Sequence, residues 1–353
     1  MVRVAINGFG RIGRAFMRAS FNHSDFTVVA VNDLGNLENL AYLLKYDTVY
    51  GRSPFPVEVK NDKLKIDDRE ITFLQQRDPE KLPWSDLDVD VVLESTGFFT
   101  NYDGAKKHLT AGAKHVVISA PAKGDPNIDG VKGATVLMGV NDNQLKTCNI
   151  SSNASCTTNA TSPVVAILKE SIGIEKAILS TVHAYTATQS LVDGPAKKDL
   201  RKGRAAAMNI IPTTTGAAIA TTKAHTELSG KFDGIAMRVP VVSGSIVDIT
   251  FVASKKTTVE EVNKALVEAA KKKRWKNIFT VTNEPIVSSD IIGSRVGSIA
   301  DLAFTRVVDG NLVKVLAWYD NEASYTQTLI EHVSAVAKNV KGKGKKDNKK
   351  GKK

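Results

Sequence analysis

Val2-Arg3-Val4-Ala5-Ile6-Asn7-Gly8-Phe9-Gly10-Arg11-Ile12-Gly13 opens the chain and decides the fold of its first part. The β-branched and apolar residues of positions 2–7 predict a strand, and positions 14–21 predict an amphipathic helix. Glycines in the spacing Gly-x-Gly-x-x-Gly lie between the two. A second predicted strand, 26–32, ends at Asp33. This strand–glycine–helix–strand–acid order is the context that a dinucleotide-binding motif requires.

Each residue of the motif has a separate physical task. Gly8 permits a tight turn, Gly10 lets a pyrophosphate approach the backbone, and Gly13 lets the helix pack closely on the strand. Asp33 can accept hydrogen bonds from a ribose diol, and its charge would repel a 2′-phosphate, which favours NAD over NADP. The alternative is a glycine-rich turn before a helix, with Asp33 as an ordinary turn residue.

Strands and helices continue to alternate through the first half of the chain. Positions 38–46 and 103–111 predict helices, 90–94 and 115–119 predict buried strands, and 54–74 predicts small antiparallel strands. This alternation predicts a Rossmann-type parallel sheet with ligands at the carboxyl ends of its strands. Thr96, Gly97 and Ser119 follow such strands and are therefore candidate cofactor contacts, although plain turn chemistry explains them equally well.

A cysteine and a histidine form the second candidate site. Cys156 lies in Ser151-Ser152-Asn153-Ala154-Ser155-Cys156-Thr157-Thr158-Asn159, where a strand gives way to a helix predicted over 162–171. The free N–H groups and dipole of a helix start favour a thiolate. The strand predicted over 177–183 ends at His183, which would complete an activated nucleophile. Alternatively, Cys156 is a buried small hydrophobe, as free cysteines usually are.

The second half predicts an α+β domain with a mainly antiparallel sheet. Strand patterns cover 232–242, 244–253 and 299–318, and 258–273 predicts a helix. A basic segment, 193–204, is by itself typical of a solvated loop, but Thr213-Thr214-Thr215-Gly216 follows at a predicted helix start, so the two together could form an anion site. Arg238 lies inside a strand pattern and needs either an anionic substrate group or an internal ion pair.

The 353 residues are 42% hydrophobic and 24% charged, as in ordinary globular proteins. No apolar run is long enough to span a membrane, no signal peptide is evident, and two cysteines form neither a disulfide framework nor a metal cluster. We therefore expect a cytoplasmic protein without a metal. Positions 338–353 carry nine lysines and one aspartate, so the rest of the chain accounts for only 11 − 8 = +3 of the net charge. We expect residues 341–353 to be a disordered lysine-rich tail.

Four motifs together resemble phosphorylating glyceraldehyde-3-phosphate dehydrogenase. They are Ala5 to Arg14, Ser152 to Asn159, Thr181-Val182-His183-Ala184-Tyr185-Thr186 and Trp318-Tyr319-Asp320-Asn321-Glu322, and the match runs from Met1 to about Val340. The resemblance implies Cys156 as nucleophile and His183 as its base. It implies NAD contacts at Arg11, Ile12, Asp33, Arg77, Ser119 and Asn321. It implies substrate-phosphate and inorganic-phosphate contacts at Ser155, Thr157, Thr186, Arg201, Thr215, Gly216 and Arg238.

The resemblance also implies a homotetramer and a first domain completed by the C-terminal helix. We expect an NAD-binding domain over 1–155 with 321–340, and a catalytic domain over 156–320. The implied activity is NAD-dependent oxidation and phosphorylation of glyceraldehyde 3-phosphate through a thiohemiacetal and a thioester. Three alternatives stay open: an erythrose-4-phosphate dehydrogenase, a Cys-His hydrolase without a redox step, and weak polyanion or RNA binding by the tail.

Overall fold

The computed structural model describes residues 1–196 and 199–350, without the side chains of 343–350. It divides into two compact units, Met1–Ala154 with the chain from Leu329 onward, and Ser155–Thr328. The first boundary lies one residue before the expected one. The second lies at Thr328 and thus inside the C-terminal helix, later than the expected Asp320.

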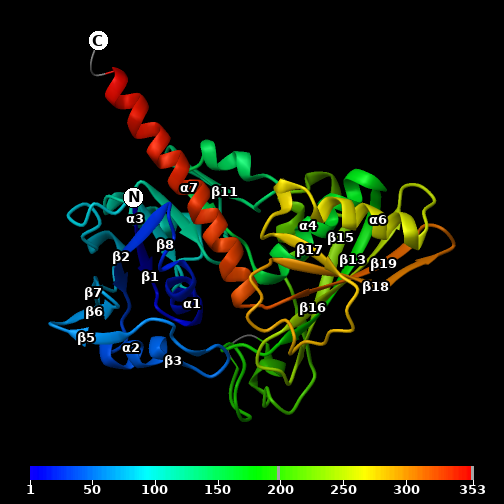
Figure 1. Ribbon diagram of the computed structural model, residues 1–353, viewed down its shortest axis with the longest axis horizontal. Coiled ribbons are helices and arrows are strands. Elements are labelled where there is room, and N and C mark those ends of the chain that lie inside the picture. Colours follow the sequence, from blue (N-terminus) through cyan, green and yellow to red (C-terminus); the bar gives the residue numbers. More distant parts are fainter. Residues whose placement is uncertain (197–198, 351–353) are drawn as a thin grey trace. The chain divides into compact units, whose positions relative to one another are not determined.

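The first unit is built on a ten-stranded sheet in the order β10-β11-β12-β9-β8-β1-β2-β7-β6-β5 (Figure 1). The six central pairings, from β11 to β7, are parallel. The strands are β1 (Val2–Asn7), β2 (Phe26–Asn32), β5 (Val57–Lys60), β6 (Lys63–Ile66), β7 (Arg69–Leu74), β8 (Val91–Glu94), β9 (His115–Ile118), β10 (Asn127–Ile128), β11 (Val131–Thr135) and β12 (Ile150–Ser152). A separate two-stranded antiparallel sheet pairs β3 (Tyr46–Asp47) with β4 (Gly51–Arg52).

The helices of this unit are α1 (Arg11–Ser20), α2 (Leu37–Lys45) and α3 (Tyr102–Thr110), with short 3-10 turns η1 (Pro79–Lys81) and η2 (Asp142–Lys146). The predicted parallel sheet is confirmed, and so are the small antiparallel strands β5–β7. Positive φ angles at Asn61, Asp62 and Asp67 let the two tight turns between these strands form.

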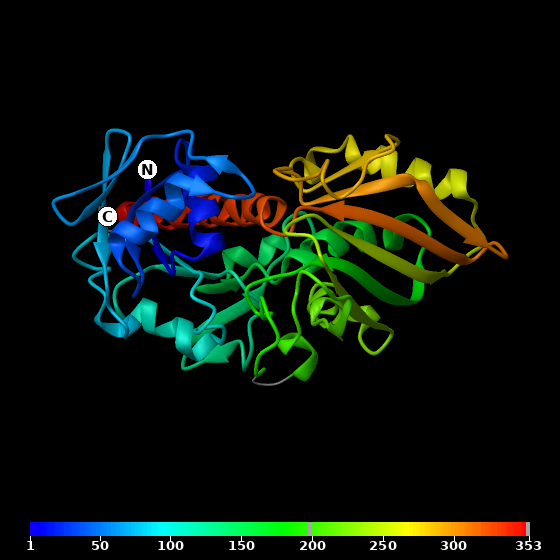
Figure 2. The same ribbon diagram turned by 90° about the horizontal axis from the view of Figure 1, so that it is seen from below.

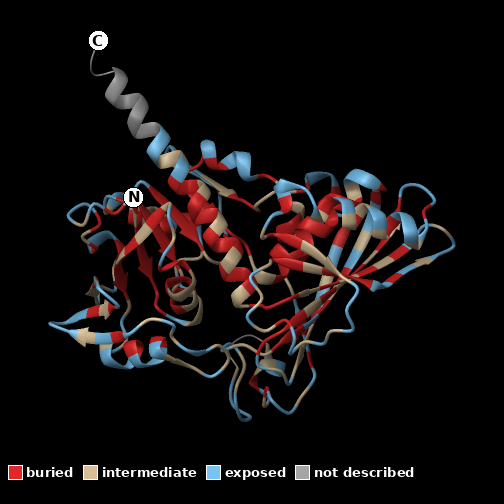
Figure 3. Ribbon diagram, in the orientation of Figure 1, coloured by how far each residue is buried: buried red, intermediate tan, exposed pale blue. Residues whose placement is uncertain are grey.

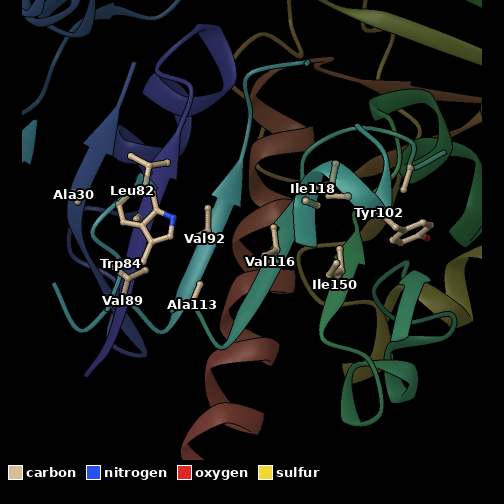
Figure 4. Packing of buried hydrophobic residues seen from close by; sticks show 13 residues of the cluster. Ala30, Leu82, Trp84, Val89, Val92, Tyr102, Ala113, Val116, Ile118 and Ile150 are labelled. Atoms are coloured by element: carbon tan, nitrogen blue, oxygen red, sulfur yellow. The ribbon is translucent and has the colours of Figure 1, made fainter. Parts of the chain in front are cut away.

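Apolar side chains between the sheet and its helices form the core of the first unit. Strands β8 and β9 are buried along their whole length, and the middle of the sheet is red in Figure 3. Trp84 is fully buried and packs with Val92, Val116 and Ile150 in one cluster (Figure 4). Strands buried on both faces give the continuous apolar runs that the sequence shows.

The second unit contains a seven-stranded sheet in the order β14-β15-β13-β16-β19-β18-β17. Its strands are drawn in green to orange in Figure 2. Four of its six pairings are antiparallel, so the predicted mainly antiparallel sheet is confirmed. Its strands are β13 (Ile174–Ala184), β14 (Ile211–Thr214), β15 (Phe232–Val239), β16 (Ser245–Ala253), β17 (Phe279–Thr282), β18 (Ser298–Val308) and β19 (Leu312–Tyr319).

Helices α4 (Cys156–Ser171) and α6 (Val259–Ala270) pack on one face of this sheet (Figure 1). Thr258 caps α6 in a capping box with Glu261. The remaining helical elements are α5 (Ala217–Thr222) and the 3-10 turns η3 (Leu200–Gly203), η4 (Thr226–Leu228) and η5 (Lys273–Trp275). Helix α4 begins at Cys156, earlier than the predicted Ser162, and contains Pro163 within its length.

Helix α7 (Ala323–Lys350) ends the described chain. His332 is fully buried: its Nδ1 lies 3.1 Å from Asn153 Oδ1 and its Nε2 lies 2.7 Å from Ser151 Oγ. The prediction of a disordered tail is wrong for residues 341–350, which continue α7. Lysine is a good helix former, and extending an existing helix avoids the cost of nucleation. Residues 351–353 lie outside the described residues.

Candidate active site

A cleft of about 430 Å³ lies in the first unit at the carboxyl ends of β1, β2 and β8. Parallel sheets bind ligands at this edge. Five of the predicted cofactor residues line the cleft: Gly8, Gly10, Asp33, Arg77 and Thr96. Its other lining residues are Asn7, Asn32, Leu34, Gln76, Ser95, Phe98 and Phe99.

The three glycines of the motif differ in what surrounds them. A Cβ at Gly8, where φ is +97°, would lie 2.5 Å from the Thr96 amide nitrogen, and one at Gly13 would lie 2.2 Å from Gly8 O. A Cβ at Gly10 would meet no atom within 4 Å. Gly8 and Gly13 therefore let chain segments approach closely, while Gly10 keeps the start of α1 open to a ligand.

Asp33 holds the glycine loop as well as facing the cleft. Its Oδ2 accepts a hydrogen bond from the Phe9 amide at 2.7 Å, and its Oδ1 accepts one from the Gly35 amide at 2.8 Å. Arg11, the first residue of α1, forms a 2.6 Å ion pair with Asp47. An open helix start beside a fixed carboxylate fits the pyrophosphate and ribose of a dinucleotide.

Six predicted cofactor residues are absent from the lining of this cleft: Arg11, Ile12, Gly13, Gly97, Ser119 and Asn321. Gly97 and Ser119 follow the ends of β8 and β9, as predicted. Asn321 belongs to the second unit, is buried, and accepts a hydrogen bond from Ser245 Oγ at 3.0 Å.

Two asparagines of the cleft were not predicted from the sequence. Asn7 and Asn32 end β1 and β2, lie opposite one another in the parallel register, and are joined by a hydrogen bond from Asn32 Nδ2 to Asn7 Oδ1 at 2.7 Å. The rule that selected Thr96, namely a polar residue at a strand's carboxyl end, could also have found them.

Cys156 is the first residue of α4, in the second unit. Ser155 caps the helix, and its Oγ accepts a hydrogen bond from the Thr158 amide at 3.1 Å. Cys156 is partly exposed as a residue, and its Sγ lies 3.3 Å from His183 Nε2. The structure thus brings together the two residues that the sequence proposed as nucleophile and base.

The register of the sheet explains why His183 faces Cys156. Along β13, Leu179, Thr181 and His183 are buried, whereas the alternate positions Ile178 and Val182 are exposed. Successive strand residues point to opposite faces, so His183 points to the buried face of the sheet, where α4 packs. Arg238 lies opposite His183 in the parallel β13–β15 pair and so lies on the same face.

The electrostatics of the pair differ from the sequence-based expectation. Burial raises the pKa of the Cys156 thiol above its ordinary value, although the Arg238 charge and the Thr157 hydroxyl act in the opposite direction. Burial and the Arg238 charge lower the pKa of His183 to about 3. The direction of the thiol pKa thus differs from the sequence-based expectation, because desolvation is the largest contribution at Cys156.

Two threonine hydroxyls hold a buried tyrosine beside this pair. Tyr319 OH lies 2.9 Å from both Thr157 Oγ1 and Thr181 Oγ1, and its ring meets the His183 ring edge-on with centroids 5.8 Å apart. Burial raises the pKa of Tyr319, so the phenol stays protonated. Thr157, which we proposed as a phosphate ligand, therefore uses its hydroxyl to position Tyr319.

The remaining predicted phosphate residues lie on short elements around the same sheet. Thr186 follows β13, with its Oγ1 2.9 Å from Thr188 Oγ1, and Gly216 precedes α5. Thr215 Oγ1 accepts a hydrogen bond from the Ala217 amide at 3.2 Å. Arg201, in η3, lines a separate cavity of about 760 Å³ with Asp199, Leu200, Pro212, Thr213, Thr214 and Ile235. Among all the predicted phosphate residues, Arg238 is the one that the described contacts place against His183.

Comparison with known proteins assigns both units of the chain to one family. Residues 2–102 match the family model for the glyceraldehyde 3-phosphate dehydrogenase NAD binding domain, and residues 155–321 match the model for its C-terminal domain. The chain belongs to the glyceraldehyde 3-phosphate dehydrogenase family. It is 48% identical over 338 residues to glyceraldehyde-3-phosphate dehydrogenase of Geobacillus stearothermophilus, covering 95% of this chain and 98% of that protein. It is 46% identical over 346 residues to the protein of that name from Clostridium acetobutylicum, covering 97% and 100%.

Membership of this family makes the chain an NAD-dependent oxidoreductase, and its Rossmann-type unit is the NAD-binding one. The family match agrees with the resemblance carried by the four motifs. Among the residues that the structure describes, no helix is long and apolar enough to cross a membrane. Within the same residues, no three His, Cys, Asp or Glu side chains gather as metal ligands would.

Proposed function

We propose that the chain oxidises glyceraldehyde 3-phosphate with NAD and inorganic phosphate to 1,3-bisphosphoglycerate, through a thioester on Cys156. The observation that carries this proposal is the 3.3 Å approach of Cys156 Sγ to His183 Nε2 in a chain of this family. A neutral imidazole within hydrogen-bond reach of a thiol is the arrangement that activates a sulfur nucleophile.

The reaction starts when Cys156 gives its proton to His183 and Sγ adds to the aldehyde carbon. The Cys156 amide at the start of α4 and the His183 imidazolium are the donors available to the thiohemiacetal oxyanion. Bound NAD supplies the hydride acceptor. The imidazolium returns its proton to this oxygen, and as the hydride leaves the carbon the neutral His183 takes that hydroxyl proton back while the thioester forms. Inorganic phosphate then displaces Sγ as the leaving thiolate and forms the acyl phosphate.

We infer that the family's cofactor and anion contacts apply here at the residues named from the sequence. Gly8, Gly10, Asp33 and Arg77 support this because they line one cleft. For the anions, Arg238 contacts His183 of the reacting pair, and Arg201 lines its own cavity.

An NAD-reduction assay tests the activity. NADH absorbance should appear on addition of glyceraldehyde 3-phosphate, and turnover should require inorganic phosphate. Turnover at the same rate without phosphate would contradict the acyl-phosphate product. Because erythrose 4-phosphate is the alternative substrate, kcat/KM for both aldehydes should be compared, and a higher value for erythrose 4-phosphate would overturn the assignment.

We further propose a cytoplasmic homotetramer. Supporting this, the face of the second unit's sheet opposite α4 exposes apolar side chains, including Ile178, Val182 and Ile235. Exposed apolar patches of this kind mark interaction sites. Light scattering should give four times the mass of the 38.0 kDa chain, and a monomeric mass at assay concentration would contradict the proposal.

The lysine-rich C-terminal segment is proposed to bind polyanions weakly and to take no part in catalysis. Deleting residues 341–353 should weaken any RNA binding, because lysine–phosphate contacts are salt-dependent and independent of sequence. NADH production should stay within about twofold of the full chain. Filter binding at two salt concentrations and the NAD-reduction assay measure the two effects, and loss of dehydrogenase activity would contradict this separation.

A further inference from the structure

A buried carboxylate adjoins the cofactor cleft and takes no part in the chemistry described above. Glu94 ends β8, and its side chain is 1% exposed. Its Oε1 accepts hydrogen bonds from the Thr96 amide at 2.8 Å and from Thr96 Oγ1 at 2.5 Å. Its Oε2 lies 2.6 Å from Asn7 Nδ2 and 3.1 Å from His108 Nε2. Asn7 and Thr96 line the cleft, so Glu94 connects lining residues at the ends of two neighbouring strands, β1 and β8.

Backbone groups fix the direction of the hydrogen bond from Asn7. The Gln76 amide donates to Asn32 Oδ1 at 2.8 Å, and Asn32 Nδ2 donates to Gln76 O at 2.9 Å. Because a backbone N–H only donates and a backbone carbonyl only accepts, the Asn32 side chain has one possible orientation. Its Nδ2 also donates to Asn7 Oδ1 at 2.7 Å. The Asn7 side chain therefore accepts through its oxygen and presents its Nδ2 donor to Glu94.

An indole fixes the contact from His108 in the same way. Trp84, in the core cluster of Figure 4, donates Nε1–H to His108 Nδ1 at 3.0 Å. An indole nitrogen is a donor and not an acceptor, so Nδ1 carries no proton and the neutral ring is protonated at Nε2. That Nε2–H is the donor to Glu94 Oε2. Asn7 Nδ2 and His108 Nε2 lie 3.3 Å apart because both donate to the same oxygen.

Both carboxyl oxygens of Glu94 must therefore accept. At Oε2, Asn7 and His108 only donate, and at Oε1 the Thr96 amide only donates. A carboxylate accepts at two oxygens, whereas a carboxamide accepts at its oxygen and donates from its nitrogen. A glutamine at this position would have nearly the same shape and yet leave donors facing each other on one side.

The two sides differ in how they can respond to such a change. Asn7 and His108 are buried, so water cannot replace a lost acceptor there, and the oxygen of a carboxamide would stay with them. Its NH₂ group would then face the Thr96 amide, in the partly exposed turn after β8. That turn has Gly97 at a φ of +77°, and the Phe98 amide donates to Thr96 Oγ1 at 3.1 Å. The turn would have to move, and its residues line the cleft.

We propose that Glu94 is a positioning residue for the cofactor: its carboxylate holds the Thr96 turn and the Asn7 side chain in the arrangement that receives the dinucleotide. These groups are then ordered before NAD binds, so binding does not bear the cost of ordering them. This rests on the proposed function in one respect, the assignment of cofactor contacts to this cleft. Glu94 and Cys156 belong to different units, so Glu94 acts on cofactor affinity and not on the thiol.

Calorimetric titration of NAD into the full-length chain tests this directly. Glu94→Gln should raise the Kd for NAD by about tenfold or more, the usual effect of losing a hydrogen bond to a charged group. In the NAD-reduction assay, the KM for NAD should rise by a similar factor, while kcat at saturating NAD stays within about twofold of the parent value. Without cofactor, backbone hydrogen exchange at residues 94–99 should be faster in the variant. A merely structural role would lower the melting temperature without raising the Kd of the folded protein.

Asp90→Asn is the matched control. It makes the same chemical change directly before β8, at the opposite end of that strand, where Asp90 accepts from the Arg3 amide and pairs with Lys114. Its Kd for NAD should equal that of the parent. If Glu94→Gln does not fold, Glu94→Asp serves instead: it keeps the charge but is one methylene shorter, so it cannot reach the donors on both sides, and the Kd should again rise.

A Kd equal to the parent's in the folded Glu94 variant, or an equal rise in Asp90→Asn, would overturn the inference. A parent that binds no NAD would refute the cofactor contacts of the proposed function. Hydrogen exchange at residues 94–99 would still decide whether Glu94 holds the turn, because unchanged exchange in the variant contradicts that role.

Discussion

The two units build their sites by different means. In the NAD-binding unit, the shape of the backbone makes the site: Gly8 and Gly13 bring segments within contact, and Gly10 leaves the helix start open. In the catalytic unit, side chains make the site, because the start of α4 and the β13 register bring Cys156 and His183 to 3.3 Å. The first kind of site fails when an atom is added, and the second fails when a functional group is removed.

Removing the sulfur nucleophile is the strongest way to test this contrast. Cys156→Ser should lower kcat by about 10³-fold or more, since a serine hydroxyl is a far weaker nucleophile than a cysteine. NAD affinity, measured by calorimetry, should stay unchanged because the cleft belongs to the other unit. Cys148→Ala alters the other cysteine, which is buried in the first unit, and should retain activity. Near-normal turnover in Cys156→Ser would refute the nucleophile assignment.

Replacing the base should have the next largest effect. His183→Asn should lower kcat by about 10²–10⁴-fold, the usual contribution of a positioned general base. The rate should then rise with pH as hydroxide deprotonates the thiol, whose pKa burial has raised. A kcat–pH profile measures both effects. His23→Asn, at a partly exposed histidine of the first unit, is the control. A profile unchanged from the parent would contradict the role of His183.

Adding one methyl group tests the backbone-made site. Gly8→Ala should destabilise the protein by about 1–3 kcal/mol, because its Cβ would lie 2.5 Å from backbone at a φ of +97°. Gly10→Ala is the matched variant: its φ is −68° and its Cβ is unobstructed, so stability should hold while NAD binding weakens. Urea unfolding and calorimetric NAD titration measure the two quantities. Equal stability losses in both variants would contradict the distinction.

The smallest expected effect concerns acid stability of the first unit. Burial lowers the pKa of His332 to about 3 from its ordinary 6.5. The unfolded chain therefore binds a proton below pH 6.5 while the folded chain does not, so stability falls as pH drops from 6.5 toward 3. At pH 5.5 the loss is about 1.4 kcal/mol.

Urea unfolding at pH 7.5 and 5.5 measures this loss. His332→Gln removes the titrating group, so the drop in unfolding free energy between the two pH values should be smaller by about that amount. A drop as large as the parent's would show that other groups cause it.

Much of the fold could be predicted because local and global signals agree. The strand pattern of 2–7, the glycine spacing and Asp33 all indicate one supersecondary unit, and β1, α1 and β2 form it. The Cys156–His183 pairing could be proposed because each residue ends or starts a strongly patterned element. Such agreement across levels is typical of natural sequences.

The features that could not be predicted depend on tertiary neighbours. The contact of Arg238 with His183 follows from the β13–β15 register, and Thr157 turns to Tyr319 across the packed face of the sheet. The thiol pKa was mispredicted because burial of Sγ cannot be counted from sequence. The helical continuation to Lys350 was missed because composition alone ignores the helix already formed before it.

The C-terminal helix imposes an order of events during synthesis. His332 bonds Ser151 and Asn153, and Ser334 Oγ donates to Asp25 Oδ2 at 2.5 Å, so the first unit needs residues from the far end of the polypeptide. A nascent chain on the ribosome holds every strand of that sheet long before this helix emerges. The segment made first is thus completed last, after the middle of the chain can already have folded, and a ribosome stalled before residue 329 carries an unfinished NAD-binding unit.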